Sequence, residues 1–206
     1  MTVYDDNFYK NITGSRVESS KVILKLIFNI LNPNSVLDVG CGRGVWLKTA
    51  KELGAEIVYG IDGEWNEGKM IDEKIFYKPV DLNQNFSLDK KFDLTICLEV
   101  AEHLTNEASQ NLIFSLINTS NTILFSSAFY YQGGIAHINE NLHSYWADLF
   151  LKNNFLPFDI VRPITWGNEK ISFWYRQNTF LYVKKNSKEF EKLSKKFIYL
   201  ENNKFM

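Results

Sequence analysis

Apolar and polar positions along the chain follow two alternating spacings. Between residues 15 and 31, apolar side chains recur at every third or fourth position, which predicts a helix that ends at Asn32-Pro33-Asn34. From residue 35 onward, short apolar runs that end in turn residues predict strands, with helical spacing between them. The predicted strands cover residues 35–39, 56–61, 75–80, 92–98, 122–127, 158–161 and 180–183, and the predicted helices cover 45–53, 106–118 and 141–153. Strands that alternate with helices in this way indicate an α/β protein with a doubly wound, mostly parallel sheet.

The length of the chain fits one domain. Its 206 residues suffice for one core but not for two full domains, at about 100–200 residues each. We expect an N-terminal helical segment over residues 1–34, a core over 35–183 and a C-terminal amphipathic helix over 184–206. The last prediction depends on apolar residues at helical spacing, namely Phe190, Leu193, Phe197 and Leu200. A partner or nucleic-acid contact is the alternative for this lysine-rich tail.

Composition and charge narrow the class of protein. The chain is 45% apolar and 23% charged, as globular proteins are, and its net charge of −1 disfavours nucleic acid as a partner. The two cysteines, Cys41 and Cys97, lack metal-ligand spacing and indicate a reducing compartment. No apolar run is long enough to cross a membrane, and the first residues do not resemble a signal peptide. We therefore expect a cytoplasmic protein that does not insert into membranes.

A glycine-rich turn follows the strand at residues 35–39. In the segment from Asp38 to Gly44, glycine occupies every second position (Gly40, Gly42 and Gly44) and a helix follows. Glycines at the carboxyl end of a first strand let the backbone approach a bound nucleotide. The spacing differs from the G-x-G-x-x-G of dinucleotide sites, and the lysine of a phosphate-binding P-loop is missing.

Three further acidic segments occur at the ends of later strands. Asp62 lies about 20 residues after the glycines, where a carboxylate can accept hydrogen bonds from a ribose. Asp81-Leu82 follows the strand at 75–80, and the segment from Phe92 to Leu104 contains Glu99-Val100-Ala101-Glu102-His103. Taken singly, Asp38 could brace the glycine turn, Asp62 could cap the next helix and Asp81 could begin a turn.

Together these segments resemble the motifs of class I S-adenosylmethionine-dependent methyltransferases, in the branch with an E-V-x-E-H motif that acts on small molecules. The resemblance implies a Rossmann-like sheet of seven strands with an antiparallel last strand, and S-adenosylmethionine as the cofactor. It also implies that Asp38 positions the methionine ammonium, that Asp62 binds the ribose and that Asp81-Leu82 contacts the adenine. The complete set of expected cofactor-binding residues is Asp38, Gly40, Cys41, Gly42, Gly44, Asp62, Gly63, Asp81, Leu82, Glu99 and Val100.

A second informative region begins after the strand at residues 122–127. It carries Gln132-Gly133-Gly134 followed by His137, Asn139 and Glu140, and residues 174–178 read W-Y-R-Q-N. Both patterns resemble a poorly characterised bacterial subgroup of these methyltransferases. The loop follows the fifth strand, so we expect it to cover the reacting methyl group.

Histidines are the candidates for catalysis. A hydroxyl acceptor needs a base for methyl transfer, and histidine titrates nearest neutral pH. We predict His137 as the base, with His103 as the second candidate and a structural role as the alternative for each. His143 is expected to serve packing. A metal site built from His137, Glu140 and His143 is disfavoured by the loose spacing of these residues, and no metal is expected.

Aromatic residues indicate the acceptor site. Of the 31 aromatic residues, 14 lie between residues 129 and 182, and those outside helical stripes could form a stacking wall for a sugar or an aromatic acceptor. The predicted substrate residues are Tyr130, Tyr131, Trp174 and Arg176. We expect O-methylation of a small-molecule or carbohydrate-linked acceptor. The alternatives are a nucleic-acid or protein methyltransferase, and a module that binds S-adenosylmethionine without catalysis.

Overall fold

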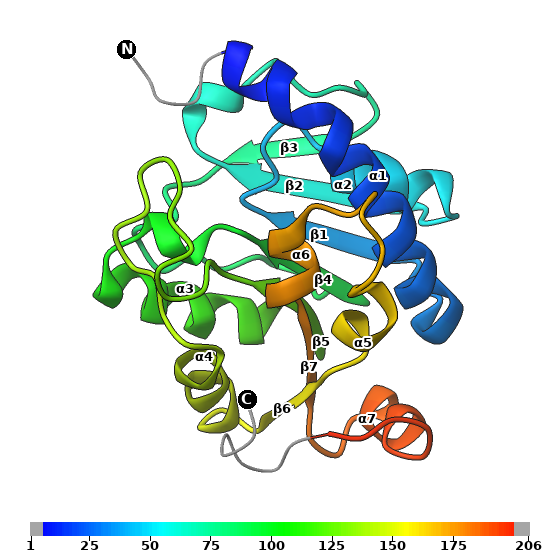
Figure 1. Cartoon of the computed structure of the whole chain (residues 1–206). Helices are drawn as coiled ribbons and strands as arrows, with labels where there is room; N and C mark the ends of the chain where they lie inside the picture. Colours follow the sequence, from blue (N-terminus) through cyan, green and yellow to red (C-terminus); the bar gives the residue numbers. More distant parts are fainter. Residues whose placement is uncertain (1–5, 200–206) are drawn as a thin grey trace.

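The computed structural model describes residues 6–199, with side chains from residue 16 onward (Figure 1). Seven strands form one sheet in the order β3-β2-β1-β4-β5-β7-β6. Their bounds are β1 Ser35–Val39, β2 Ile57–Asp62, β3 Phe76–Pro79, β4 Leu94–Leu98, β5 Thr122–Ser126, β6 Phe155–Phe158 and β7 Phe180–Lys184. Strands β1 to β5 pair in parallel, and β7 runs antiparallel to both β5 and β6. The predicted fold class is confirmed, including the antiparallel last strand.

Helices cover both faces of this sheet (Figure 1). Their bounds are α1 Asp6–Leu31, α2 Val45–Glu52, α3 Asn106–Thr119, α4 His143–Leu151, α5 Val161–Thr165, α6 Phe173–Asn178 and α7 Lys188–Leu193, with short 3-10 helices η1 Glu64–Asn66 and η2 Ala101–His103. Because successive strand residues point to opposite faces, Val36 joins the core under α1, α2 and α6, whereas Leu37 joins the core under α3 and α4. Both layers are therefore apolar where they meet the sheet. In residues 6–199, no helix combines the length and apolar character that a membrane crossing requires.

Many of the aromatic residues between 129 and 182 belong to the core. Phe150 stacks on Tyr182 with ring centroids 3.9 Å apart, and both rings contact Phe125. Seven of the 14 are buried, namely Trp146, Phe150, Phe155, Phe158, Tyr175, Phe180 and Tyr182. The aromatic residues of this segment therefore fill the core between α4 and the antiparallel strand β7, and others lie at the surface. It is a weaker indicator of the acceptor site than the sequence suggests.

Three elements in the last third of the chain differ from the sequence prediction. Strand β6 begins at residue 155, three residues before the predicted start, because Asn154 adopts a left-handed conformation (φ 62°) that ends the preceding turn. Pro157 lies within β6, which is tolerated because β6 is an edge strand. Residues 173–178 form α6, where loops or strand starts were expected. Helix α7 has six residues, far fewer than the predicted segment 184–206, and Leu200 lies outside the described residues.

Candidate active site

A cavity of about 230 Å³ lies at the carboxyl ends of the parallel strands, where open α/β sheets bind ligands. It is lined by Arg16, Gly40, Gly42, Asp62, Trp65, Asp81, Leu82, Asn83, Glu99, Val100, His103 and Leu104. The four motifs singled out in the sequence all contribute residues to the lining of this cavity. They are the glycine turn, Asp62, Asp81-Leu82 and the segment from Phe92 to Leu104. Cys41, Gly44 and Gly63 belong to the same loops without lining the cavity in the described part of the chain.

The glycine turn after β1 needs its glycines for backbone geometry. Gly40, Gly42 and Gly44 all have positive φ, at 77°, 52° and 82°, in the left-handed region that other residues adopt with strain. A Cβ on Gly40 would also come within 2.4 Å of a Val100 methyl group. Gly40 donates its amide to the carbonyl of Ile61 at 2.8 Å, so the turn is tied to the end of β2. The loop therefore lies flat on the floor of the cavity.

Asp62 is held on two sides by backbone amides. Its Oδ2 accepts from Gly42 and its Oδ1 accepts from Gly63, both at 2.7 Å. Burial raises the pKa of this carboxyl, and the two backbone donors oppose that shift. The ring of Trp65 covers Gly63 so closely that a Cβ there would meet it at 2.0 Å. Asp62 presents a fixed acceptor beside an aromatic face, which suits a ribose next to a purine.

Asp38 lies deeper, below the glycine turn. Its side chain is 3% exposed, and Oδ2 has no hydrogen-bond partner among the described residues. Burial raises the pKa of Asp38 to about 8, Asp62 acts in the same direction, and the guanidinium of Arg16 opposes them. A buried carboxyl oxygen without a partner, under a loop that shapes a cavity, fits a site that receives a cationic group. Cys41 and Cys97 are buried free thiols.

Asp81 and Leu82 lie at the rim of the cavity. The Oδ1 of Asp81 accepts from both the backbone amide and the side-chain amide of Asn83, at 3.0 and 2.8 Å. These bonds lower the pKa of Asp81. Asp81 thus begins a turn and lines the cavity at once. Leu82 and Leu104 supply apolar surface on this side.

Glu99 joins the motif after β4 to the two distant segments of the subgroup pattern. It has a positive φ of 57°, and its carboxylate accepts from Gln132 Nε2 at 3.4 Å and from Asn178 Nδ2 at 3.3 Å. Asn178 Nδ2 also donates to Gln132 Oε1 at 2.8 Å, and Asn178 Oδ1 contacts His143 Nε2 at 3.2 Å. We call Glu99, Gln132 and Asn178 the polar junction. It fixes the 127–142 loop against α6.

His103 and His137 face one another beside the cavity. Their rings meet edge to face with centroids 4.9 Å apart, and His103 lines the cavity. The Nδ1 of His137 lies 3.0 Å from Glu140 Oε1, and the Nδ1 of His103 lies 3.3 Å from the carbonyl of Ala136. Burial lowers the pKa of His103 to about 4, and the neighbouring His137 adds to that shift. The structure therefore brings both predicted catalytic histidines together.

Directly before His103, Glu102 is fully buried. Its Oε2 accepts from the Ser127 hydroxyl at 3.0 Å, whereas Oε1 has no hydrogen-bond partner within residues 16–199. Burial raises the pKa of Glu102 well above its usual value, and the nearby Glu99 carboxyl reinforces the shift. The sequence names Glu102 only as part of a motif, without a role. Its place beside the two histidines is visible only in the folded chain.

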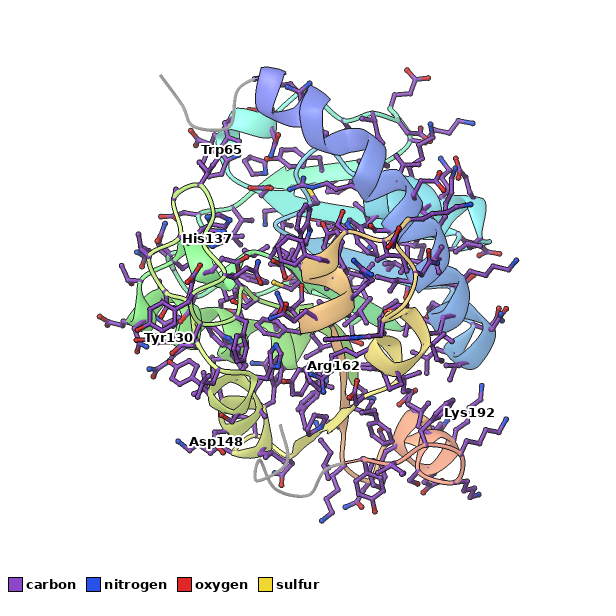
Figure 2. All side chains as sticks on the ribbon, viewed as in Figure 1. Trp65, Tyr130, His137, Asp148, Arg162 and Lys192 are labelled. Carbon is purple, nitrogen blue, oxygen red and sulfur yellow. The ribbon has the colours of Figure 1, made fainter. Side chains whose placement is uncertain are left out.

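The four predicted substrate residues are not among the residues that line the cavity of the described chain. Tyr130 and Tyr131 pack edge to face on the outer side of the 127–142 loop, and Tyr131 is 87% exposed. Trp174 packs against the core through Tyr175. Arg176 donates to the carbonyl of Trp166 at 2.9 Å and ties α6 to the segment after α5. Figure 2 shows Trp65, His137 and Tyr130 in that order down the left side of the view.

Arg16 and Trp65 line the cavity although they were not predicted to bind the cofactor. Arg16 comes from α1, which lies before all four sequence motifs in the chain. Trp65 follows Asp62 by three residues, and that proximity to an acidic motif is the signal that would have found it. Asn83 and Leu104 border the predicted motifs in the same way.

Comparisons with known proteins identify the family. A family model described as a methyltransferase domain matches residues 15–160, and the chain therefore belongs to this methyltransferase family. The finer resemblance, to the small-molecule branch and the loop subgroup, stays a prediction.

Curated relatives match only part of the chain. The ribosomal protein L11 methyltransferase of Lactobacillus johnsonii is 31% identical over 121 residues, 52% of this chain and 38% of that protein. The same enzyme of Thermosipho africanus is 30% identical over 122 residues, 50% of this chain and 47% of that protein. This chain thus spans less than half the length of either relative.

Solved structures share the fold. DesVI of Streptomyces venezuelae superposes with a TM-score of 0.67 at 12% identity, covering 87% of this chain and 96% of that one. Magnesium protoporphyrin IX methyltransferase (ChlM) of Synechocystis with bound SAH gives 0.58 at 18% identity, covering 84% of each chain. Human N-acetylserotonin methyltransferase in complex with SAM gives 0.57 at 15% identity, covering 81% of this chain and 51% of that one. Proteins of this fold hold the predicted cofactor or its product, which supports S-adenosylmethionine as the cofactor.

Proposed function

We propose that this chain transfers a methyl group from S-adenosylmethionine to a hydroxyl oxygen of a small-molecule or sugar-linked acceptor. The observation that carries the proposal is the pair of imidazoles, His103 and His137, beside a cavity that is also lined by Asp62 and the glycine turn. A methyl donor and a proton acceptor are the two things that O-methylation needs.

The residues of the cavity fit the cofactor. Asp62 would accept hydrogen bonds from the ribose, with Trp65 and Leu82 beside the base. The unpaired Oδ2 of Asp38 lies under the turn, where the cationic end of the molecule would be stabilised. When bound, S-adenosylmethionine supplies a methyl group on a positively charged sulfur, and S-adenosylhomocysteine remains after transfer.

The histidine side of the cavity would orient the acceptor. The acceptor hydroxyl would point between His103 and His137, and its proton would pass to an imidazole nitrogen as the oxygen bonds to carbon. The Oε1 of Glu140, at 3.0 Å from the Nδ1 of His137, fixes the orientation of the ring. The polar junction holds the 127–142 loop over this space, so the acceptor is aligned by a preorganised wall.

A protein acceptor is the second candidate, because the curated relatives are named ribosomal protein L11 methyltransferases. The match covers about half of this chain. Two arms of one experiment separate the candidates. The protein is incubated with S-adenosylmethionine and either a panel of hydroxylated sugars, nucleotide sugars and phenols, or purified ribosomal protein L11, and release of S-adenosylhomocysteine is measured with product mass.

We expect release with a hydroxylated small molecule and a product heavier by one methylene. Release only with the ribosomal protein would replace the proposal with the second candidate. Tight binding of S-adenosylhomocysteine without turnover in either arm would favour a binding module instead.

A further inference from the structure

Three side chains beside the cofactor cavity have the composition of a metal site. They are Glu102, His103 and His137. Each offers one ligand atom, and these three atoms lie within 4.8 Å of one another. Glu102 and His103 come from η2, and His137 comes from the 127–142 loop, so the fold brings the group together across 34 positions of sequence. Two imidazoles and one carboxylate are a common ligand set for divalent transition metals, which leaves further coordination positions open.

The carboxyl group of Glu102 supplies an independent observation. The residue is fully buried, and its Oε1 has no hydrogen-bond partner in the described residues, while Oε2 is satisfied by Ser127. Leaving a buried carboxyl oxygen unpaired is costly, and native proteins compensate for it with a hydrogen-bond donor or a cation. The two imidazoles within 4.8 Å place suitable partner ligands around a cation at this oxygen.

Both imidazoles are also oriented as metal ligands usually are. The Nδ1 of His137 faces Glu140 Oε1 at 3.0 Å, and the Nδ1 of His103 faces the carbonyl of Ala136 at 3.3 Å. A metal-bound histidine ordinarily donates its other N–H to a carboxylate or a carbonyl in this way, which directs the Nε2 lone pair at the metal. Gly134 leaves room for the His137 ring, because a Cβ there would lie 2.3 Å from it.

We propose that Glu102, His103 and His137 bind a divalent transition-metal ion in the wall of the cofactor cavity, with Glu140 positioning His137. The site differs from the grouping of His137, Glu140 and His143 that the sequence analysis considered. In the structure His143 is turned away, toward Asn178 and Phe180. This inference rests on the proposed function, from which it takes the acceptor that carries a hydroxyl group. It differs in one step, because the metal ion activates the hydroxyl in place of an imidazole.

His103 lines the cavity, so an ion here would have its open positions toward the acceptor. An acceptor hydroxyl bound to the ion loses its proton to water, because a coordinated cation lowers the pKa of a bound hydroxyl. An oxygen lone pair then forms the bond to the methyl carbon, and the electron pair of the broken carbon–sulfur bond stays on sulfur. In this scheme His137 holds the ion and does not receive the proton.

The test measures metal binding directly. The full chain is stripped with a chelator and titrated with Co²⁺, followed by visible absorption, and with Mn²⁺, followed by calorimetry. We expect one ion per chain, and a loss of affinity of about tenfold or more in Glu102→Gln and His137→Ala. Glu140→Ala should weaken binding by about 10–100-fold, and Glu140→Gln, which keeps an acceptor for Nδ1, should restore part of it. The matched control is Glu169→Gln, an exposed carboxylate away from the site, which should bind as the wild type does.

Binding of S-adenosylhomocysteine, measured by calorimetry on every variant, separates the two proposals. Normal binding shows that a variant is folded and that the cofactor site is intact. The metal site is refuted if the wild type shows no saturable binding of Co²⁺ or Mn²⁺, or if Glu102→Gln and His137→Ala both bind as tightly as the wild type. Failure of the wild type to bind S-adenosylhomocysteine would refute the proposed function, whatever the metal titrations show.

Discussion

The carboxylate of Asp62 holds the backbone of Gly42 through a hydrogen bond of 2.7 Å. Asp62 is the last residue of β2, Gly42 lies in the turn after β1, and the two strands pair in parallel. The same side chain caps the amide of Gly63, so one carboxylate orders the turns after both strands. The shape of the cavity at the strand ends therefore depends on this residue.

We expect Asp62→Asn to weaken binding of S-adenosylhomocysteine by about 10–100-fold. Asparagine has one acceptor oxygen, so it loses a charge-assisted bond of about 1.5–3 kcal/mol and turns an amide group toward a backbone donor. Isothermal titration calorimetry measures the change. Asp89→Asn, on an exposed turn, is the matched control. Equal affinities for both variants would show that Asp62 has no part in the cofactor site.

The stability of the ligand-free protein should fall with pH because of Asp38. Its pKa in the folded chain is raised to about 8 by burial, from 3.8 for the ordinary side chain. Between those values the folded state keeps a proton that the unfolded state has lost, so the unfolding free energy decreases by about 1.4 kcal/mol per pH unit from this group. The effect is absent below pH of about 4 and complete above about 8.

Urea denaturation of wild type and Asp38→Asn across this pH range provides the measurement. Asp62, Arg16, Cys41 and Cys97 surround Asp38 electrostatically in both proteins, so the difference between the two curves isolates Asp38. We expect the stability of the wild type to decline more steeply than that of Asp38→Asn. Parallel curves would contradict the raised pKa.

Asn178→Ala should lower turnover more than cofactor affinity. The buried amide donates to Glu99 and Gln132, and its loss leaves their oxygens without this donor and loosens the 127–142 loop. An unsatisfied buried group costs about 1–3 kcal/mol, which also lowers the urea midpoint. Asn118→Ala on the exposed side of α3 serves as the control. A drop in cofactor affinity as large as the drop in kcat would show that the polar junction does not act on the acceptor side.

Phe150→Ala should destabilise the chain by about 3–5 kcal/mol. The ring is fully buried, stacks on Tyr182 at 3.9 Å and contacts Phe125 at 5.3 Å, so its removal leaves a cavity that α4 and β7 cannot close. Chemical denaturation provides the free energy of unfolding. Phe114→Ala, on a ring that is 57% exposed, should change it by less than about 1 kcal/mol. Similar losses for both variants would argue against a core role for this stack.

Sequence patterns predicted the fold, and they placed most of the expected cofactor residues at one edge of the sheet, for a local physical reason. Apolar runs define the strands, and the glycine turn and Asp62 come directly after two of them, so neighbouring strand ends place both at one edge. Strand β6 was misplaced because its limits depend on the left-handed Asn154 and on an edge position that tolerates Pro157. Neither the left-handed residue nor the edge position produces a repeating pattern of apolar residues in the sequence.

The acceptor side could not be assembled from the sequence. Glu102 and His137 are far apart in the chain, and their proximity depends on the path of a loop without regular structure. The role of Asn178 depends likewise on α6, a helix of six residues that was not predicted. Tyr131 and Trp174 were predicted to contact the substrate because aromatic rings can stack on an acceptor. Whether such a ring faces a ligand depends on how its neighbours pack, and sequence patterns do not reveal that packing.

The 127–142 loop has a division of roles with consequences for protein engineering. The side chains of Gln132, Asn139 and Glu140 make internal hydrogen bonds, whereas Ile135 and Ile138 are 59% and 66% exposed and have apolar side chains that make none. Mutations at the outward positions can therefore accumulate without disturbing the wall that aligns the reaction. A library confined to the side chains at those positions would show how far the surface of the loop can change while its path stays fixed.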